Sequence, residues 1–426
     1  MQVTVEPPAG LVGGPIAIRI TEIPANAEVT LEVKTTDAAG QRWVSRTRYL
    51  ATAGTIDPSH QAPVDGAYTG VDPTGPIWSM SFASEGSIPR AFVAPRDQMT
   101  LTFTATARSS AAASSEAVRW WSAPGVTRVP VSGDGFAGAL YLPPGAGPQP
   151  AVAVVPGTTG AAAVEPMAAV LASAGFAAMV VAYLGEPGLP STLVEIPLEG
   201  LAAGFRRLAD HEVVAQGRIA VLCVSVGTEG ALAALAEIPG LPVRAVIAIA
   251  PSSVIWQALT PGRPPSTSSW TLGGQPLPYL RMRTDRLLPQ VLGDALRKRL
   301  SRRPGPTALR LYPAFAAGLD DPAAVERARI RVERIPAPLL LLSGDDDEVW
   351  PASRMAADLL RRRTAIAAAD EHHAYAGAGH FLRPPVTPTT VTWTDDLRSG
   401  GTPAGVAAAQ RAAWSRVDLF LREHLG

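Results

Sequence analysis

The sequence predicts two domains, a β-sandwich over residues 1–122 and a doubly wound α/β domain over residues 123–426. The chain has 426 residues, which is more than one ordinary domain holds. Short segments that alternate apolar and polar residues fill the first part and are typical of half-buried antiparallel strands. In the second part, continuous apolar strands alternate with helical patterns, which indicates a parallel sheet covered on both faces.

The first domain reads as strands separated by turns that contain Pro or Gly, and it shows no helical pattern of convincing length. Its clearest strands are expected at Ile16–Ile20, Val29–Lys34, Trp43–Tyr49 and Met99–Ala107. Such a domain is a β-sandwich by pattern, and we expect it to shield or orient its partner domain rather than to carry catalysis. Trp120, Trp121 and the Pro-Gly turn after them mark the boundary.

The second domain opens with a hairpin over residues 127–142 and then alternates strands with helices. Strands are expected at Ala151–Val155, Phe176–Tyr183, Ile219–Val224, Ala245–Ala250, Pro338–Ser343 and near Ala365–Ala369. Helices are expected at Pro166–Ala174, Pro197–His211, Thr228–Ala236, Ala352–Arg363 and from Ala404 to about His424.

Residues 252 to about 333 interrupt this alternation and predict a lid insertion beside the centre of the sheet. They are rich in Pro, Ser, Trp and Arg, with one helical piece near Leu287–Leu300. Basic residues gather there, and two interpretations stay open: a solvated helix face, or a binding site for the phosphates of a carrier such as coenzyme A. The candidates for the second are Arg297, Lys298 and Arg299.

Composition excludes several classes of partner. The formal net charge is zero, which argues against nucleic acid or an anionic membrane surface as the main partner. One Cys forms no intrachain disulfide and fits a reducing, cytoplasmic compartment. We expect neither a signal peptide nor a membrane span, because Gly175 divides the apolar run Met167–Leu184 into a helix and a strand. Only two of the 37 basic residues are Lys, a bias that hints at a GC-rich bacterial genome.

One segment of the second domain predicts a nucleophile elbow. The apolar strand Ile219–Val224 leads directly into Ser225-Val-Gly, and an Ala- and Leu-rich helix follows. A Ser at the apex of a strand–turn–helix junction is exposed, and Gly227 gives the crowded backbone room. Cys223 stands at the other position where a small residue is usual. We interpret it as a buried structural residue and not as a rival nucleophile.

A Ser nucleophile needs a base, and the base needs an acid that fixes its tautomer. In doubly wound hydrolases the order along the chain is Ser, acid, His. His380 lies in a small-residue loop after the last strand and is the expected base, whereas His372 and His373 are expected on the surface. The expected acid is Asp347, which follows a strand in a run of three Asp, with Asp346 as the alternative.

The oxyanion of the reaction needs two N–H donors. Val226, directly after the Ser, supplies one, and Thr158, in the Gly-rich loop after strand Ala151–Val155, is expected to supply the other. That loop also has a plain interpretation as an ordinary strand-to-helix turn. No metal site is expected, because the Glu371-His-His cluster lacks a second set of ligands and is interpreted as a surface turn. No phosphate-binding Gly-rich fingerprint is present, so nucleotide hydrolysis is not indicated.

Segments across nearly the whole chain resemble the family of acyl-CoA thioesterases and bile acid-CoA:amino acid N-acyltransferases. They lie at residues 67–80, 140–145, 172–177, 190–204, 346–350, 375–385 and 400–403. The resemblance implies an N-terminal immunoglobulin-like β-sandwich and a C-terminal α/β-hydrolase domain. It also implies Ser225 as nucleophile, Asp347 as acid and His380 as base. In this family a Ser nucleophile accompanies thioester hydrolysis and a Cys accompanies transfer to an amino acid, so hydrolysis is implied here.

The expected function is therefore hydrolysis of an acyl-CoA in lipid metabolism, with coenzyme A as part of the substrate and no other cofactor. One alternative is an acyltransferase that passes the acyl group to an amine or an alcohol, as in secondary metabolism. A second is an esterase or peptidase that needs no carrier, and a third is a non-catalytic binding protein. The expected partner is a small acyl thioester, and both a monomer and a homodimer stay open.

Overall fold

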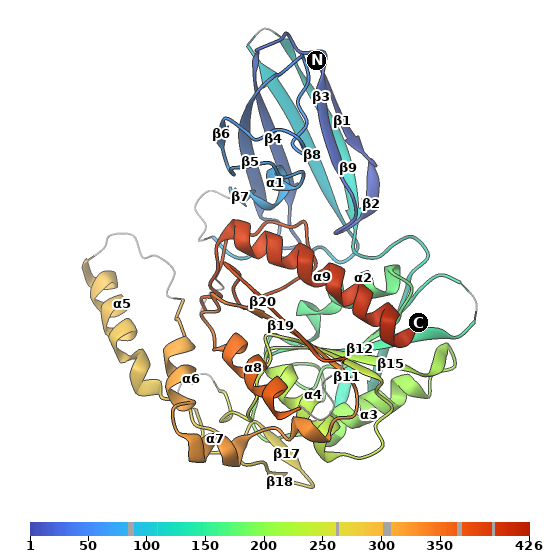
Figure 1. Cartoon of the computed structure of the whole chain (residues 1–426), viewed down its shortest axis with the longest axis vertical. Coiled ribbons are helices and arrows are strands. Elements are labelled where there is room, and N and C mark those ends of the chain that lie inside the picture. Colours follow the sequence, from blue (N-terminus) through green and yellow to red (C-terminus); the bar gives the residue numbers. More distant parts are fainter. Residues whose placement is uncertain are drawn as a thin grey trace.

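The computed structural model describes residues 1–83, 89–108, 110–145, 147–260, 264–300, 308–363, 369–393 and 397–426. A sheet-rich N-terminal domain stands on a larger α/β domain, and helix α9 (Pro403–Leu425) runs along the boundary between them (Figure 1). The N-terminus lies at the far end of the first domain, and the C-terminus ends α9 in the second.

Two sheets form the N-terminal domain, as predicted for a β-sandwich. The smaller pairs β1 (Gln2–Glu6) with β3 (Ala17–Thr21). The larger runs in the order β2 (Ala9–Leu11), β9 (Ser110–Trp120), β8 (Gln98–Ala107), β4 (Glu28–Thr36), β5 (Arg42–Leu50) and β6 (Asp65–Gly66), with β7 (Ser81–Phe82) also on β5. Every second side chain of β4 is buried, which confirms the period of two in the sequence. One short helix, α1 (Gly75–Trp78), lies beside this sheet.

An eight-stranded, mostly parallel sheet forms the centre of the second domain, which confirms the predicted α/β class. Its order is β10 (Thr127–Gly133), β11 (Phe136–Leu142), β13 (Ala177–Val180), β12 (Gln149–Val155), β15 (Val214–Val224), β16 (Ala245–Ile249), β19 (Leu339–Gly344) and β20 (Glu371–Tyr375). In this sheet β11 runs opposite to the other strands, so the β10–β11 and β11–β13 pairs are antiparallel and the remaining pairs are parallel. The inner strands are buried on both faces, which is why they read as continuous apolar runs.

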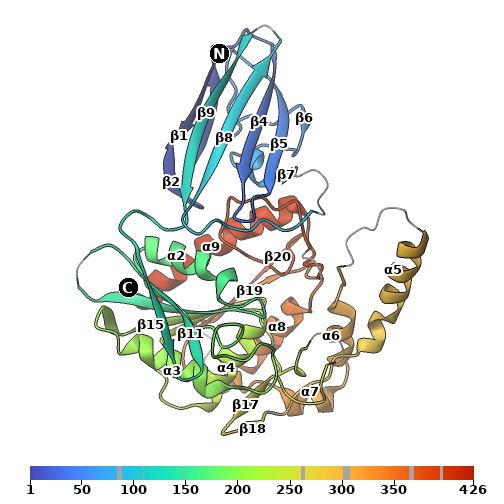
Figure 2. The same cartoon turned by 180° about the vertical axis from the view of Figure 1, so that it is seen from behind.

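Helices cover both faces of this sheet (Figures 1 and 2). Helices α2 (Glu165–Ser173) and α9 pack on the face toward the β-sandwich, in one core with buried residues of that domain. Helices α3 (Leu198–Ala209), α4 (Val226–Glu237) and α8 (Ala352–Arg362) pack on the opposite face. Among the described residues, no helix is both long and apolar enough to span a membrane.

The last strand of the sheet differs from its prediction. Most of the predicted strand near Ala365–Ala369 lies outside the described residues, and the edge strand is β20. The interpretation of Glu371-His-His as a surface turn is wrong, because these residues pair with β19 in parallel. An edge strand has one free side and tolerates polar residues, so no apolar run marked it. His372 Nε2 lies 2.8 Å from Ser343 Oγ on the neighbouring strand.

The insertion between β16 and β19 contains several short elements. Strands β17 (Trp270–Leu272) and β18 (Gln275–Pro276) form a small sheet with β14 (Ile196–Pro197). Helices follow at α5 (Leu288–Leu300), α6 (Tyr312–Gly318) and α7 (Pro322–Ala328), with short 3-10 turns η2 (Thr284–Leu287) and η3 (Val332–Arg334). Helix α5 confirms the predicted helical piece, and it stands at the outer edge of the molecule (Figures 1 and 2).

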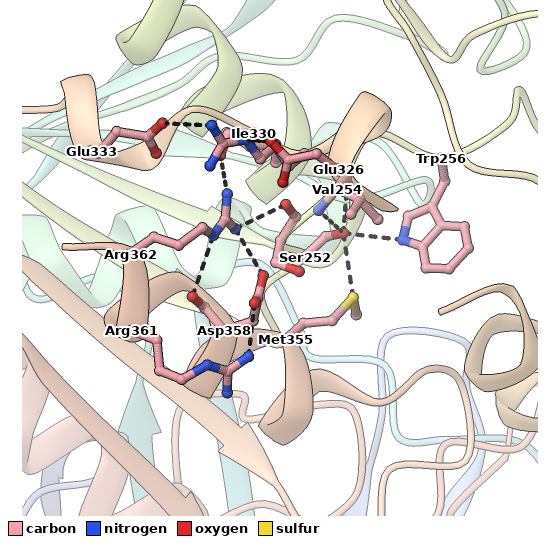
Figure 3. Close-up of polar contacts among 12 residues, drawn as sticks. Ser252, Val254, Trp256, Glu326, Ile330, Glu333, Met355, Asp358, Arg361 and Arg362 are labelled. Carbon is pink, nitrogen blue, oxygen red and sulfur yellow. Dashed lines mark hydrogen bonds and ion pairs between the residues drawn. The ribbon is translucent and has the colours of Figure 1, made fainter. Parts of the chain in front are cut away.

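Polar contacts anchor both ends of the insertion to helix α8 (Figure 3). The Arg362 guanidinium donates to the carbonyl of Ile330 at 2.7 Å and to that of Ser253 at 3.2 Å, and it also pairs with Asp358 at 2.9 Å. The Ser252 hydroxyl accepts the indole N–H of Trp256 at 3.0 Å. Since both ends are fixed to one helix, the base of the insertion is a rigid part of the fold.

Arg363 is almost fully buried directly after α8, and its charge is compensated there. It pairs with the Asp370 carboxylate at 2.7 and 3.0 Å, and its remaining N–H groups donate to the carbonyls of Val332, Ile335 and Ala337. Two residues earlier, Arg361 is largely exposed and pairs with Asp358 on the surface.

These two arginines provide a matched test of buried and exposed ion pairs. Arg363→Gln should lower the free energy of unfolding by about 3–5 kcal/mol, because it leaves the buried Asp370 without its cation. Arg361→Gln should change it by less than about 1 kcal/mol, because water screens the exposed pair. Urea unfolding of both variants measures the difference. Equal losses of unfolding free energy in the two variants would contradict the conclusion that the buried Arg363–Asp370 pair stabilises the fold more than the exposed pair does.

Candidate active site

Ser225 lies at the junction of β15 and α4, in a backbone conformation that residues other than Gly seldom adopt. Its φ is +54° and its ψ is −128°. The surrounding backbone holds it there: the Ser225 N–H donates to the Ile249 carbonyl at 2.9 Å, and the Ser225 carbonyl accepts the N–H of Thr228 at 2.8 Å. Such strain persists only where neighbouring structure enforces it, and it is common at catalytic positions.

Two glycines let the backbone close around Ser225. A Cβ on Gly227 would collide with the carbonyl of Pro156, so the predicted need for a small residue is confirmed at that position. A Cβ on Gly157 would lie 3.2 Å from Ser225 Cβ, which shows that the loop after β12 runs directly against the Ser. Cys223 is fully buried inside β15, and burial raises the pKa of its thiol. A buried thiol of raised pKa is a poor nucleophile, so the structural interpretation of Cys223 is favoured.

The structure brings Ser225, His380 and Asp347 together in one hydrogen-bonded chain. His380 Nε2 lies 2.8 Å from Ser225 Oγ, and His380 Nδ1 lies 2.8 Å from Asp347 Oδ2. The side chains of His380 and Asp347 are each only 2% exposed. The other carboxylate oxygen of Asp347 accepts the N–H groups of Val349 at 2.7 Å and Trp350 at 3.2 Å. These contacts fix the carboxylate, and the carboxylate fixes the imidazole.

The three residues come from different parts of the chain, and backbone contacts connect their loops. The His380 N–H donates to the carbonyl of Ser399 at 2.8 Å, and Asp347 forms an isolated bridge with Gly400. The ring of Trp350 packs edge-on against the imidazole of His380, with the two ring centroids 5.7 Å apart. Asp346, the alternative acid, is exposed, and the structure gives it no contact with the imidazole. Sequence order alone left Asp346 open, and in this structure Asp347 is the carboxylate in contact with His380 Nδ1.

The two expected oxyanion donors belong to backbone segments next to Ser225, the start of α4 and the loop after β12. Val226 is the first residue of α4, where backbone N–H groups lack partners within the helix. Thr158 follows Gly157 in the loop that touches Ser225. This arrangement supports an oxyanion hole formed by the two N–H groups, and the assignment of these two donors remains a prediction.

The predicted basic residues lie on helix α5. Arg297 pairs with Asp294 at 2.9 Å, Arg299 is exposed, and the side chain of Lys298 lies outside the described residues. Helix α5, which carries them, stands apart from the sheet (Figure 2). In the part of the chain that the structure describes, no group of three or more His, Cys, Asp and Glu residues could hold a metal ion.

Two residues near the Ser were missed in the sequence. The Thr228 hydroxyl donates to the Ser225 carbonyl at 2.6 Å and accepts the N–H of Ser252 at 3.0 Å, which links the elbow to the insertion. Glu229 is completely buried one turn after Ser225, and its carboxyl accepts the N–H of Trp256 at 3.0 Å. A Glu in an otherwise Ala-, Leu- and Gly-rich helix was the only signal for Glu229.

Burial raises the pKa of Glu229 to about 8, from an ordinary value of 4.5, so its carboxyl is neutral at neutral pH. Because the unfolded chain ionises above 4.5 and the folded one only near 8, stability should fall as pH rises between these values, by up to about 1.4 kcal/mol per pH unit. Glu229→Gln, which stays neutral, should lose less stability between pH 5.5 and 7.5. Urea unfolding at both pH values measures this. The same loss in both proteins would contradict a neutral buried Glu229.

Comparisons with known proteins give the family. A model of the "Acyl-CoA thioester hydrolase/BAAT N-terminal region" matches residues 14–133, and one of the "BAAT / Acyl-CoA thioester hydrolase C terminal" matches residues 306–426. The bile acid-CoA:amino acid N-acyltransferase of Mus musculus is 27% identical over 100% of this chain and 98% of its own length. Acyl-coenzyme A thioesterase 5 of the same species is 26% identical over 96% and 93%.

Among solved structures, a thermophilic and thermostable carboxylesterase cloned from a metagenomic library is 16% identical, with a TM-score of 0.40 over 71% of this chain and 88% of its own. The strand order of the central sheet, and not this similarity, is the basis for the fold class. Models of one family match the N-terminal and the C-terminal part of this chain, and relatives are similar over almost its full length. Together they confirm the family resemblance of the sequence. The chain belongs to the acyl-CoA thioester hydrolase and bile acid-CoA:amino acid N-acyltransferase family, and it is an enzyme of the hydrolase and acyltransferase type.

Proposed function

We propose that the protein hydrolyses acyl-CoA thioesters through a covalent acyl-enzyme on Ser225. The observation that carries this proposal is the continuous hydrogen-bonded chain from Ser225 through His380 to Asp347, with both links at 2.8 Å. A Ser at a strained strand–helix junction, a base in contact with it and a buried acid behind the base are the parts that acyl transfer requires. The relatives, which include acyl-CoA thioesterases, supply the substrate class.

In the first half of the reaction, His380 Nε2 accepts the Ser225 hydroxyl proton as Oγ attacks the thioester carbonyl carbon. Asp347 accepts the Nδ1–H of His380, which sets the tautomer and stabilises the imidazolium that forms. The N–H groups of Val226 and Thr158 stabilise the oxyanion. The C–S bond then breaks, and the imidazolium returns its proton to the coenzyme A thiolate.

In the second half, water attacks the acyl-enzyme carbonyl and His380 accepts its proton. The tetrahedral intermediate collapses, the free carboxylic acid leaves, and Ser225 recovers its hydroxyl proton from the imidazolium. Coenzyme A is thus part of the substrate and not a resident cofactor. Arg297, Lys298 and Arg299 remain the proposed contacts for its phosphates, since guanidinium and ammonium groups both bind phosphate oxygens and residues of α5 are exposed.

The second candidate is an acyltransferase, because several of the full-length relatives are amino acid N-acyltransferases. Both activities share the acyl-enzyme and differ in whether water or an amine attacks it. A Ser nucleophile favours hydrolysis, since the acyl-enzyme is then an oxygen ester, which reacts with amines less readily than a thioester does.

Removal of the Ser225 hydroxyl tests the nucleophile. Ser225→Ala should lower kcat for acyl-CoA hydrolysis by about three orders of magnitude or more, because no covalent intermediate can form. Cys223→Ala is the matched control, two residues earlier in the same strand, and should keep activity within about threefold. Release of free coenzyme A, followed with a thiol reagent, gives both rates. Full activity in Ser225→Ala would refute the mechanism.

The fate of the acyl group separates the two candidates. With an acyl-CoA and millimolar glycine, the wild-type enzyme should release mainly the free acid, because water resolves an oxygen ester. Ser225→Cys should raise the ratio of amide to acid, because its acyl-enzyme is a thioester. Chromatography of the acid and the acyl-glycine measures the ratio. An amide as the main wild-type product would favour the acyltransferase instead.

A further inference from the structure

A cavity of about 430 Å³ lies between the two domains, and the mechanism above does not use it. Residues 90–94 and Trp121 of the first domain form one side. On the other side are the turn before α2 and the segment after His380, up to Trp393. This volume is in the range of sites that hold small organic molecules, and such sites are common between domains.

The N-terminal domain shapes the cavity by holding the segment that follows His380. The Thr389 N–H donates to the carbonyl of Trp78 at 3.0 Å, and the Trp393 indole N–H donates to that of Pro89 at 3.2 Å. Within the same segment Val386 is buried with φ +66°, a conformation that is a genuine outlier for a β-branched residue. Strain that is maintained by contacts from another domain is typical of a functional segment.

Two arginines line this cavity, the exposed Arg90 and the partly exposed Arg383. The guanidinium carbon of Arg383 lies 4.9 Å from the centre of the Phe381 ring, and Nη1 donates to the Phe92 carbonyl at 3.4 Å. Among the described residues, no carboxylate pairs with it. The Arg383 side chain is partly exposed to solvent, and partial desolvation lowers the pKa of its guanidinium. An Arg has five N–H donors, so most of its hydrogen-bonding capacity remains for a ligand.

The rest of the wall is largely apolar, with Phe92, Val93, Val391 and Trp393 among its members. A partly exposed cation beside an apolar wall can attract an anion, because pairing offsets the cost of its partial desolvation. The planar guanidinium matches a carboxylate with two parallel N–H···O bonds. The ligand that fits both features has an apolar body and one carboxylate.

We propose that this cavity binds a carboxylate-bearing organic molecule, with the carboxylate on Arg383 and the apolar body along the aromatic wall. Gly379 and Phe381, the neighbours of His380, line the cavity, as does Ser399, whose carbonyl accepts the His380 N–H. The site therefore lies against the backbone that positions the base. The carboxylate has two sources: the far end of the acyl group, or a separate carboxylic acid. Only the first of these sources rests on the proposed thioester hydrolysis.

Two arms of one experiment distinguish the sources, each with wild type, Arg383→Gln and Arg383→Lys. In the first arm, kcat/KM is compared for adipoyl-CoA and hexanoyl-CoA, which have the same chain length and differ in a terminal carboxylate. In the second, binding of octanoate and octanamide to Ser225→Ala protein is measured by calorimetry, which needs no catalysis. Arg361→Gln, on the surface of α8, is the control for loss of a positive charge.

The proposal predicts that Arg383→Gln reduces the preference for the carboxylate form at least about tenfold in one arm, with a smaller effect for Arg383→Lys and none for Arg361→Gln. A loss in the first arm assigns the carboxylate to the acyl group, and a loss in the second assigns it to a separate acid. Unchanged preferences in both arms, in folded Arg383→Gln protein, would overturn it. If Arg383→Gln does not fold, a wild-type enzyme without preference for either carboxylate form would overturn it equally.

Since the second arm uses protein that lacks the Ser225 hydroxyl, its outcome is independent of the proposed mechanism. Failure of the hydrolase proposal would show as full turnover by Ser225→Ala. Failure of the anion site would show as equal binding of octanoate and octanamide, while turnover of the wild-type enzyme still depends on Ser225.

Discussion

The close approach of two backbones around Ser225 is the constraint on which the rest of the site depends. At the end of β15 the chain turns into α4 within one residue, and Ser225 takes a positive φ to do so. The turn is possible only because Gly227 lets the helix lie against Pro156, and because Gly157 leaves room beside the Ser itself. The same contact brings the loop after β12 against the start of α4. The position of Ser225 and the close approach of the loop after β12 thus follow from one packing contact.

Asp347 and His380, the proposed acid and base, are held by backbone contacts rather than by long side-chain networks. Asp347 and His380 lie on loops after neighbouring strands of the sheet, and the segment around Gly400 bridges both. That segment leads into α9, which packs along the boundary with the β-sandwich. The first domain in turn fixes the chain beyond His380 through hydrogen bonds to Thr389 and Trp393. These contacts fix the segment that follows His380 against the first domain.

Local rules explain why so much of the site could be predicted from the sequence. Buried parallel strands read as apolar runs, and a Ser between such a run and an Ala-rich helix has few other interpretations. Features that depend on distant partners could not be predicted. The polar edge strand at Glu371 is defined by pairing with β19, and the burial of Glu229 depends on Trp256 in the insertion. The surroundings of Arg383 require both domains.

Direct detection of the covalent intermediate tests the central claim, which is that the acyl group passes through Ser225. The enzyme would be mixed with an acyl-CoA, quenched in acid within milliseconds, digested and analysed by mass spectrometry. We predict a peptide heavier by the acyl group, with the modification on Ser225, that forms and decays at the rate of turnover. Turnover without this adduct, or an adduct on Cys223, would contradict it.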